Sequence, residues 1–354
     1  MKKFQWIALL MACCFAFGAC GNQAADLGES EVVSGLTLDL DYPAAEGLPT
    51  DYEMPEEYIV DENVALSAAS GSGNSGSSAT GGTYTGTISI VENIAPGTQV
   101  FSKNGSVIDV SNASQGYVMV KQSGVSKRLK VQIVMGDKKY NYDLNNAGNF
   151  EAFPLQMGNG NYKIRIMQNK EGNSYVELFS AQINVTLDNS NAPFLCPSQY
   201  VNYSASSAAV KKSFDLCVGA SGDVDRLKAI YTWIIDNISY DTQKAETVQT
   251  GYLPKVDDTL STKTGICFDY ASLMACMLRA QGIPTKLVIG TVSPKDLNHA
   301  WNEVYLKGVG WVTVRLYFSG NKWERMDATF GASGNQNIED FIGNGENYTA
   351  LRIY

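Results

Sequence analysis

The chain has 354 residues, of which 44% are hydrophobic and 18% are charged. This length suits about two folded domains, and the composition excludes a wholly disordered chain. The formal net charge of −9 argues against a nucleic-acid partner, because binding to the phosphate backbone requires a basic surface.

The first twenty residues are typical of an export signal. Lys2 and Lys3 precede Trp6–Ala19, a mostly apolar stretch of fourteen residues. Such a stretch is shorter than the roughly 20 residues that span a bilayer, but it fits the core of a signal peptide. The sequence Phe17-Gly18-Ala19-Cys20 then resembles a lipoprotein signal box. The resemblance implies that Cys20 becomes the lipidated first residue, so that the membrane is a partner through a lipid anchor.

Three alternatives to this lipid anchor stay open. Cys13 is a rival lipidation site, although it would leave a very short apolar core. An ordinary cleaved signal without lipid and a retained membrane helix are the others. The lipid reading predicts an exported protein at the extracellular face of the bacterial cell membrane.

Residues 21–82 are predicted to form a disordered tether. Residues 21–80 contain twelve Asp or Glu and no Lys or Arg, and Ser67–Gly82 is rich in Gly, Ser and Ala. Such a composition behaves as flexible coil and cannot bury enough apolar surface to become ordered. Residues 81–354 hold 25 basic and 24 acidic side chains, so the acidity of the chain belongs to the tether and not to a binding face.

Residues 83–190 have the pattern of an all-β sandwich domain. Four segments favour strand, and most of them alternate apolar and polar residues: 117–120, 129–134, 162–166 and 181–185. Turn signals such as Gly136-Asp137 and Glu171-Gly172-Asn173 separate them. Strands spaced in this way indicate an antiparallel sandwich. The region holds no His and no Cys, and we interpret it as a spacer or a binding module.

Residues 191–354 are predicted to form an α+β domain, with helices first and antiparallel strands afterward. Five apolar residues recur at helical spacing after Ser221, an N-cap residue type: Val224, Leu227, Tyr231, Ile234 and Ile238. Four strands are expected later in the chain: Thr285–Thr291, Ala300–Leu306, Trp311–Tyr317 and Trp323–Asp327.

A second helix, Cys267–Gln281, is apolar almost all round. A helix of this kind is expected at the centre of its domain. Gly282 followed by Pro284 would stop it in the usual order.

Three residues of this domain form a candidate catalytic set. Cys267 begins the apolar helix, and a helix N-terminus favours thiolate over thiol and offers N–H groups to an oxyanion. His299 is the one histidine of the chain and begins a predicted strand, and Asp327 ends a later one. A thiol, an imidazole and a carboxylate that orients the imidazole are what nucleophilic amide chemistry requires.

From about Asp223 to Phe330, the chain closely resembles the transglutaminase-like superfamily. The resemblance rests on ordered blocks: Asn237-Ile238-Ser239-Tyr240-Asp241, Gly265-Ile266-Cys267, Gly282-Ile283-Pro284, His299-Ala300-Trp301-Asn302-Glu303, Gly310-Trp311 and Asp327-Ala328-Thr329. It implies a papain-like fold, with the Cys-bearing helix packed on an antiparallel sheet, and a Cys-His-Asp triad at Cys267, His299 and Asp327. Ala328 departs from the Pro of many members, which weakens the turn but leaves the carboxylate.

Two further roles are considered from this resemblance. The family takes a second oxyanion donor from an upstream side chain, for which Tyr240 is a candidate. Trp301 is expected to pack beside His299, with core packing as its main role.

Other chemistry has little support in the sequence. Four cysteines follow Cys20, with no Cys-x-x-Cys and a single histidine, so neither a metal site nor a cofactor is expected. Cys276 lies nine residues after Cys267, which places it on the opposite face of the helix as a core residue. Cys196 and Cys217 could form a disulfide or both stay reduced, and the sequence does not decide between the two.

The function that these patterns predict is an extracellular thiol enzyme acting on peptide or side-chain amides. By analogy with bacterial relatives, hydrolysis is favoured over acyl transfer. The expected partner is a peptide or protein substrate, with cell-wall peptide among the candidates. The alternative is a non-catalytic surface-binding lipoprotein whose triad is a relic.

Overall fold

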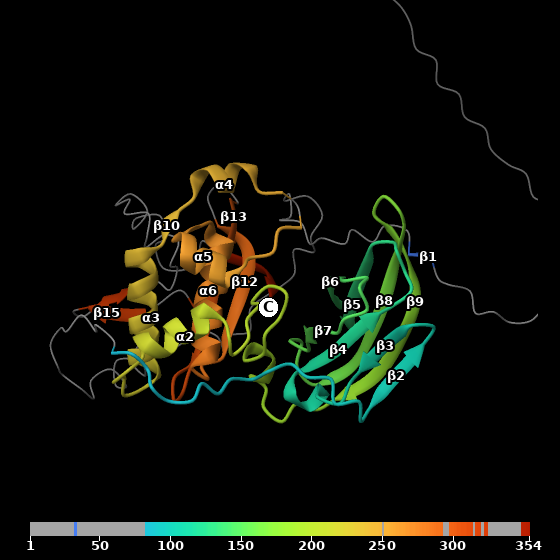
Figure 1. The fold of residues 1–354 in the computed structure, drawn as a ribbon, viewed down its shortest axis with the longest axis horizontal. Helices are drawn as coiled ribbons and strands as arrows, with labels where there is room; N and C mark the ends of the chain where they lie inside the picture. The colour runs from blue at the N-terminus through green and yellow to red at the C-terminus, as the bar shows by residue number, and fades with distance from the viewer. Residues whose placement is uncertain are drawn as a thin grey trace, which may run out of the picture.

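A computed structural model of the protein describes residues 32–33, 82–249, 251–292, 297–313, 316–319, 322–324 and 348–354. Figure 1 shows a β-rich unit beside a unit of mixed helices and strands, with the C-terminal end of the chain between them. None of the described helices is both long and apolar enough to cross a membrane.

The β-rich unit consists of two antiparallel sheets. One sheet has the order β2-β3-β4-β7, with β2 (Val100–Lys103), β3 (Ser106–Asp109), β4 (Tyr117–Gln122) and β7 (Glu151–Pro154). The other has the order β1-β9-β8-β5-β6, with β1 (Val32–Val33), β5 (Leu129–Met135), β6 (Lys138–Leu144), β8 (Gly160–Glu171) and β9 (Ser174–Val185). The short 3₁₀ helix η2 (Ala113–Gln115) precedes β4.

Alternation of side chains explains why these segments pair as they do. Ile108 and Val120 of the first sheet share one hydrophobic cluster with Ile133 and Ile164 of the second. The strands β3, β4, β5 and β8 that carry these residues therefore each bury one face between the sheets, as strands of period two require. The β-rich region expected from the sequence is confirmed, and all four predicted strands are present.

The hairpin turns follow from the turn residues. Gly136 (φ 58°) and Gly172 (φ 51°) each take the first position of a two-residue loop, β5–β6 and β8–β9 respectively. Two-residue hairpins favour a left-handed backbone at this position, and glycine adopts it without steric cost.

Strand β1 belongs to the segment predicted to be a tether. Val32 and Val33 pair antiparallel with Val176 and Tyr175 of β9. The rest of the segment up to residue 81, together with Cys20, lies outside the described residues. Its disorder stays a prediction.

The mixed unit places five helices beside a four-stranded antiparallel sheet of order β14-β13-β12-β17. The helices are α2 (Ala208–Leu216), α3 (Asp223–Asn237), α4 (Thr242–Thr247), α5 (Val256–Thr262) and α6 (Cys267–Ala280), and the 3₁₀ helix η3 (Ala192–Phe194) precedes them. The sheet contains β12 (Thr285–Val292), β13 (Leu297–Leu306), β14 (Gly310–Thr313) and β17 (Tyr348–Ile353).

Two small strand pairs complete this unit. Strands β10 (Ser239–Tyr240) and β11 (Thr264–Gly265) run parallel. Strands β15 (Leu316–Ser319) and β16 (Lys322–Glu324) run antiparallel. The single strand expected over 311–317 is thus two strands, β14 and β15, with residues 314–315 between them undescribed.

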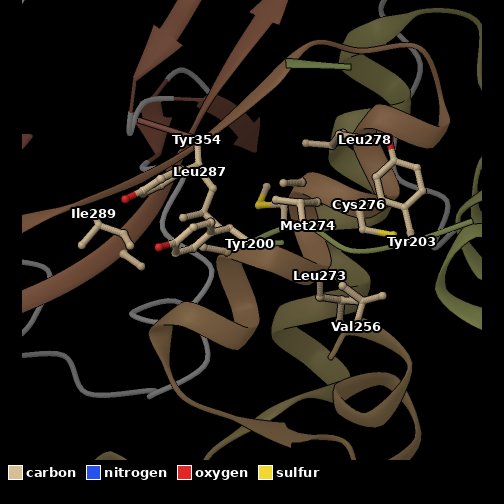
Figure 2. Close-up of a cluster of buried hydrophobic side chains, with 14 of the residues drawn as sticks. Tyr200, Tyr203, Val256, Leu273, Met274, Cys276, Leu278, Leu287, Ile289 and Tyr354 are labelled. Carbon is tan, nitrogen blue, oxygen red and sulfur yellow. The ribbon is translucent and has the colours of Figure 1, made fainter. Parts of the chain in front are cut away.

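Helix α6 is the core of this unit, as its sequence predicts. Every residue from Cys267 to Ala280 is buried. Figure 2 shows Leu273, Met274 and Cys276 of α6 pointing into a cluster that also holds Tyr200 and Leu287.

The start of α3 differs from the sequence-based expectation. Gly222, and not Ser221, is the N-cap, because the Ser221 hydroxyl donates to the Asp225 carboxylate at 2.5 Å instead of capping the backbone. Val224 is 42% exposed. It therefore lies off the buried face, which Leu227 and the later apolar residues of the helix form.

Arg279, near the end of α6, ties three parts of the chain together. The side chain is 2% exposed. Its Nε donates to the carbonyl of Thr285 at 2.9 Å, and its two terminal nitrogens donate to the carbonyls of Cys196 at 2.7 Å and Tyr354 at 2.9 Å. Burial lowers the pKa of Arg279, and the carbonyl dipoles offset part of the cost of burying its charge.

An aromatic cluster joins the β-rich unit to the mixed unit. The ring of Tyr354 stacks on Tyr200 with centroids 3.9 Å apart. It also meets Tyr140 and Tyr142 of β6 edge-on, at 5.6 and 5.9 Å. Both geometries are favourable between aromatic rings, and Figure 2 shows Tyr354 beside Tyr200. The two units thus share a packed core.

A buried ion pair links β12 to β13. Lys286 Nζ lies 2.8 Å from Glu303 Oε2, and the side chains are only 2% and 0% exposed. The ammonium also lies 4.0 Å from the centre of the Trp311 ring, a favourable cation–π position. The second carboxylate oxygen, Oε1, has no hydrogen-bond partner among the described residues.

Candidate active site

Cys267 is the first residue of α6, as the sequence predicts. The N-cap residue Ile266 has an extended backbone, with φ −94° and ψ 174°, so the chain turns sharply into the helix at the thiol. Cys267 is 5% exposed. The unsatisfied N–H groups and partial positive charge of a helix N-terminus surround this position.

His299 lies near the start of β13, opposite Gly290 of β12. It is 6% exposed. The ring of Trp301 lies nearly parallel to the imidazole at a centroid distance of 6.3 Å, and Trp301 is buried. The prediction that Trp301 packs beside His299 is confirmed. A Cβ at Gly290 would overlap Trp301 and the carbonyl of Thr349, so only glycine leaves room for this packing.

The topology brings the starts of α6 and β13 to one end of the unit. The end of α6 meets the start of β12, where Arg279 Nε donates to the Thr285 carbonyl at 2.9 Å. Strand β13 runs antiparallel to β12 and therefore runs in the same direction as α6. Asn302 Nδ2 of β13 donates to the Ala271 carbonyl of α6 at 3.0 Å, which holds the strand against the helix.

This arrangement has a direct consequence for the candidate residues. Cys267 precedes the Ala271 contact by one helical turn, and His299 precedes Asn302 by three strand positions. Both therefore lie toward the same end of the α6–β13 pair. Asp327, the predicted carboxylate of the triad, lies outside the described residues.

Tyr240, the candidate for a second oxyanion donor, lies beside the start of α6. It pairs in parallel with Gly265, two residues before the thiol. It is 36% exposed, and its ring centroid is 6.5 Å from that of Tyr270. Its role as a donor stays a prediction.

Next to the thiol lies a buried polar cluster that was not predicted from the sequence. Asp269 is fully buried. Its Oδ2 accepts from the Ile266 backbone N–H at 2.8 Å and from Lys244 Nζ at 2.7 Å, and its Oδ1 accepts from the Tyr252 hydroxyl at 2.5 Å. Burial and the bond to Asp269 raise the pKa of Tyr252. A signal was present, since an acidic residue at the third helix position is half of a capping box.

The three other described cysteines are buried or partly buried. Burial raises the pKa of Cys196 and of Cys217 to about 12, and it raises the pKa of Cys276 further. All are free thiols, so no disulfide joins Cys196 to Cys217. The core position expected for Cys276 is confirmed, at 0% exposure.

Among the described residues, no group of three or more His, Cys, Asp or Glu side chains is placed to hold a metal ion.

Residues 211–328 match the family model of the transglutaminase-like superfamily. The chain contains a transglutaminase-like domain. The family and the mixed α and β fold that the sequence predicts are therefore confirmed. The matched segment runs from α2 to the region of the predicted Asp327 and includes Cys267 and His299.

Two curated relatives align with about half of the chain. The kyphoscoliosis peptidase of Mus musculus is 28% identical over 189 residues, and that of Homo sapiens is 27% identical over the same length. Each alignment covers 49% of this chain and 26% of the relative. The chain therefore spans about a quarter of the length of these relatives.

Two solved structures match the chain at lower sequence identity. A proposed cysteine protease from Cytophaga hutchinsonii has a TM-score of 0.34 and 16% identity, covering 67% of this chain and 83% of its own. The periplasmic domain of TgpA from Pseudomonas aeruginosa has a TM-score of 0.31 and 16% identity, covering 69% of this chain and 77% of its own.

Proposed function

We propose that the protein is an extracellular thiol enzyme that acts on peptide or side-chain amides. Membership of the transglutaminase-like superfamily supports an enzyme of this class. Cys267 would attack the amide carbonyl, His299 would take the thiol proton and pass it to the leaving amine, and Asp327 would orient the imidazole. We favour hydrolysis over acyl transfer, in which water and not a second amine would release the acyl group from the thiol.

The position of the thiol carries this proposal. Cys267 is the first residue of a buried helix that contacts the strand bearing His299. The helix N-terminus supports the thiolate before attack and the oxyanion after it. No described cysteine besides Cys267 begins a helix, which favours it over the other thiols as the nucleophile.

A thiol-directed affinity label provides the first test. We expect one label per full-length molecule, on Cys267, after incubation with a peptidyl electrophile at neutral pH. His299→Ala should abolish the labelling, because the thiol loses the base that activates it. Mass spectrometry of the digested protein identifies the labelled cysteine, and Cys276→Ser serves as the matched control with unchanged labelling.

The alternative function, a surface-binding lipoprotein with a relic triad, predicts the opposite result. Label would then reach Cys267 no faster in the wild type than in His299→Ala. Equal labelling of Cys196 or Cys217 would also contradict an activated thiol at residue 267.

The lipid anchor is a proposal of the same kind. Cys20 would carry the lipid and hold the enzyme at the outer face of the membrane, with peptide or protein substrates, such as cell-wall peptide, within reach of the tether.

We expect Cys20→Ala to release the protein from the membrane fraction, because the proposed lipid is the contact that would hold the mature chain at the membrane. Fractionation followed by immunoblotting measures the shift, with Cys13→Ala as the matched control that stays bound. A Cys20→Ala protein that still sediments with membranes would contradict the anchor.

A further inference from the structure

The buried carboxylate of Asp269 creates an electrostatic problem for the thiol. Asp269 stands two residues after Cys267 in the first turn of α6. A negative charge in the first turn interacts favourably with the positive end of the helix. It therefore draws on the same positive potential that would stabilise a thiolate at Cys267, and two negative charges at this spacing also repel each other.

Lys244 supplies the compensating charge. Its Nζ lies 2.7 Å from Asp269 Oδ2 and 4.3 Å from the centre of the Tyr252 ring. The carboxylate has no exposed surface, whereas the Lys244 side chain is 30% exposed. In such a buried place the pair is weakly screened by solvent and salt.

We propose that Lys244 is a positioning residue for the nucleophile. Its ammonium compensates the negative charge of Asp269, so that the positive potential at the start of α6 can stabilise the thiolate of Cys267. The carboxylate can then perform its structural task, the bond to the Ile266 backbone N–H, without disfavouring the thiolate. This inference rests on the proposed function, because it concerns the reactivity of Cys267.

The cluster also fixes the chain around the thiol. A Cβ at Gly265 would lie 2.6 Å from the Cβ of Asp269, so the carboxylate packs directly on the strand that leads to the nucleophile. Lys244 lies in α4, which follows β10, the other strand of the pair, directly after Asp241. One ion pair thus joins both sides of the β10–β11 pair at the helix start.

Other titratable groups near this end of α6 stay unchanged in the Lys244 and Asp269 variants of the test below. They are Tyr270 of α6, Tyr240 of β10, Asp241 before α4, Tyr252, His299 of β13 and Tyr348 of β17. The side chain of Asp241 accepts from the backbone N–H of Lys244 at 2.8 Å, a bond that no substitution of the Lys244 side chain removes.

The test is the pH dependence of alkylation of Cys267 by iodoacetamide in the full chain, followed by mass spectrometry. Lys244→Met should raise the midpoint by about one pH unit and slow alkylation roughly 10-fold below it, because Asp269 loses its counter-charge. Asp269→Asn should lower the midpoint, because the opposing charge is gone and Lys244 remains. A purely structural role for the pair would move both variants in the same direction.

Matched variants separate charge from shape. Lys244→Arg keeps the charge, so it should keep the wild-type midpoint. Tyr252→Phe should keep it too, because it removes two hydrogen bonds, to Asp269 and from Lys244, but no charge. Lys244→Gln, whose amide can still donate to Asp269, should have the same midpoint as Lys244→Met. It replaces that variant if the Lys244→Met protein does not fold. Labelling of Cys276, which is fully buried, reports any unfolded fraction.

The outcomes distinguish this inference from the function on which it rests. A wild-type Cys267 that alkylates no faster than a free thiol would overturn the proposed function itself. A reactive wild type with the same midpoint in Lys244→Met and Lys244→Gln would overturn the role of Lys244 and leave the function standing. Shifts of equal sign in Lys244→Met and Asp269→Asn would also overturn it.

Discussion

Replacing Asp327 with asparagine is expected to lower turnover of an amide substrate by up to about 10⁴-fold, by analogy with the serine triad. In the proposed triad the carboxylate holds the imidazole of His299 in the tautomer that accepts the thiol proton. Asparagine offers an N–H where that tautomer also presents one, and so it favours the wrong form. The measurement is kcat, from amine release on a peptide-amide library, with urea unfolding as a check that the variant is folded.

Substitutions of the other two members of the proposed triad should lower turnover non-additively. Cys267→Ala and His299→Ala should each cost about as much turnover as the double variant, because neither residue acts without the other. Additive losses in the double variant would show two independent contributions and would argue against a shared proton transfer. Cys276→Ser, which alters a fully buried thiol of the same helix, should retain turnover.

Lys286→Met is expected to lower the free energy of unfolding by about 3–5 kcal/mol, because it leaves the carboxylate of Glu303 buried and unpaired. Glu303 is 0% exposed and its partner 2%, so water cannot replace the lost ammonium. Urea unfolding measures the change. This is a large share of the roughly 5–15 kcal/mol that a typical domain has.

The double variant Lys286→Met/Glu303→Leu separates the two possible causes. Removing both charges should restore most of the lost stability, because two well-packed apolar side chains can replace a buried ion pair at little cost. Should the double variant unfold as easily as Lys286→Met, the loss would come from packing against Trp311 and not from the unpaired charge. Lys307→Met, at an exposed position, serves as the surface control.

Local patterns explain what the sequence could predict of the fold. Helix α6 is apolar on all sides and ends before Gly282 and Pro284, so its burial and its C-terminus followed from composition and from the known stop signals. The hairpins at Gly136 and Gly172 followed from turn chemistry. Strands β2 and β6 were not anticipated. Strand β2 is exposed along its whole length and so has no apolar face. Strand β6 opens with Lys138 and Lys139, which are exposed, and buries residues only further along.

The residues of the candidate site also divide into those that the sequence predicted and those that it did not. Cys267 and His299 lie in short motifs that can be recognised one at a time. Lys244, Tyr252 and Asp269 meet from three separate segments, and a charged residue in a polar stretch gives no sign that it will be buried against another. The ion pair of Lys286 and Glu303 was hidden for the same reason, because pairing across strands depends on register.

The three carbonyls that bind Arg279 come from segments that are synthesised at different times. One belongs to Tyr354, whose ring also contacts those of Tyr200 and Tyr142. Synthesis runs from residue 1 upward, so α6 is complete long before the residue that closes the core around it. A chain halted short of residue 354 would leave a charged guanidinium and several aromatic faces open to water. The buried surroundings of Arg279 at the end of α6 are therefore complete only when residue 354 is in place.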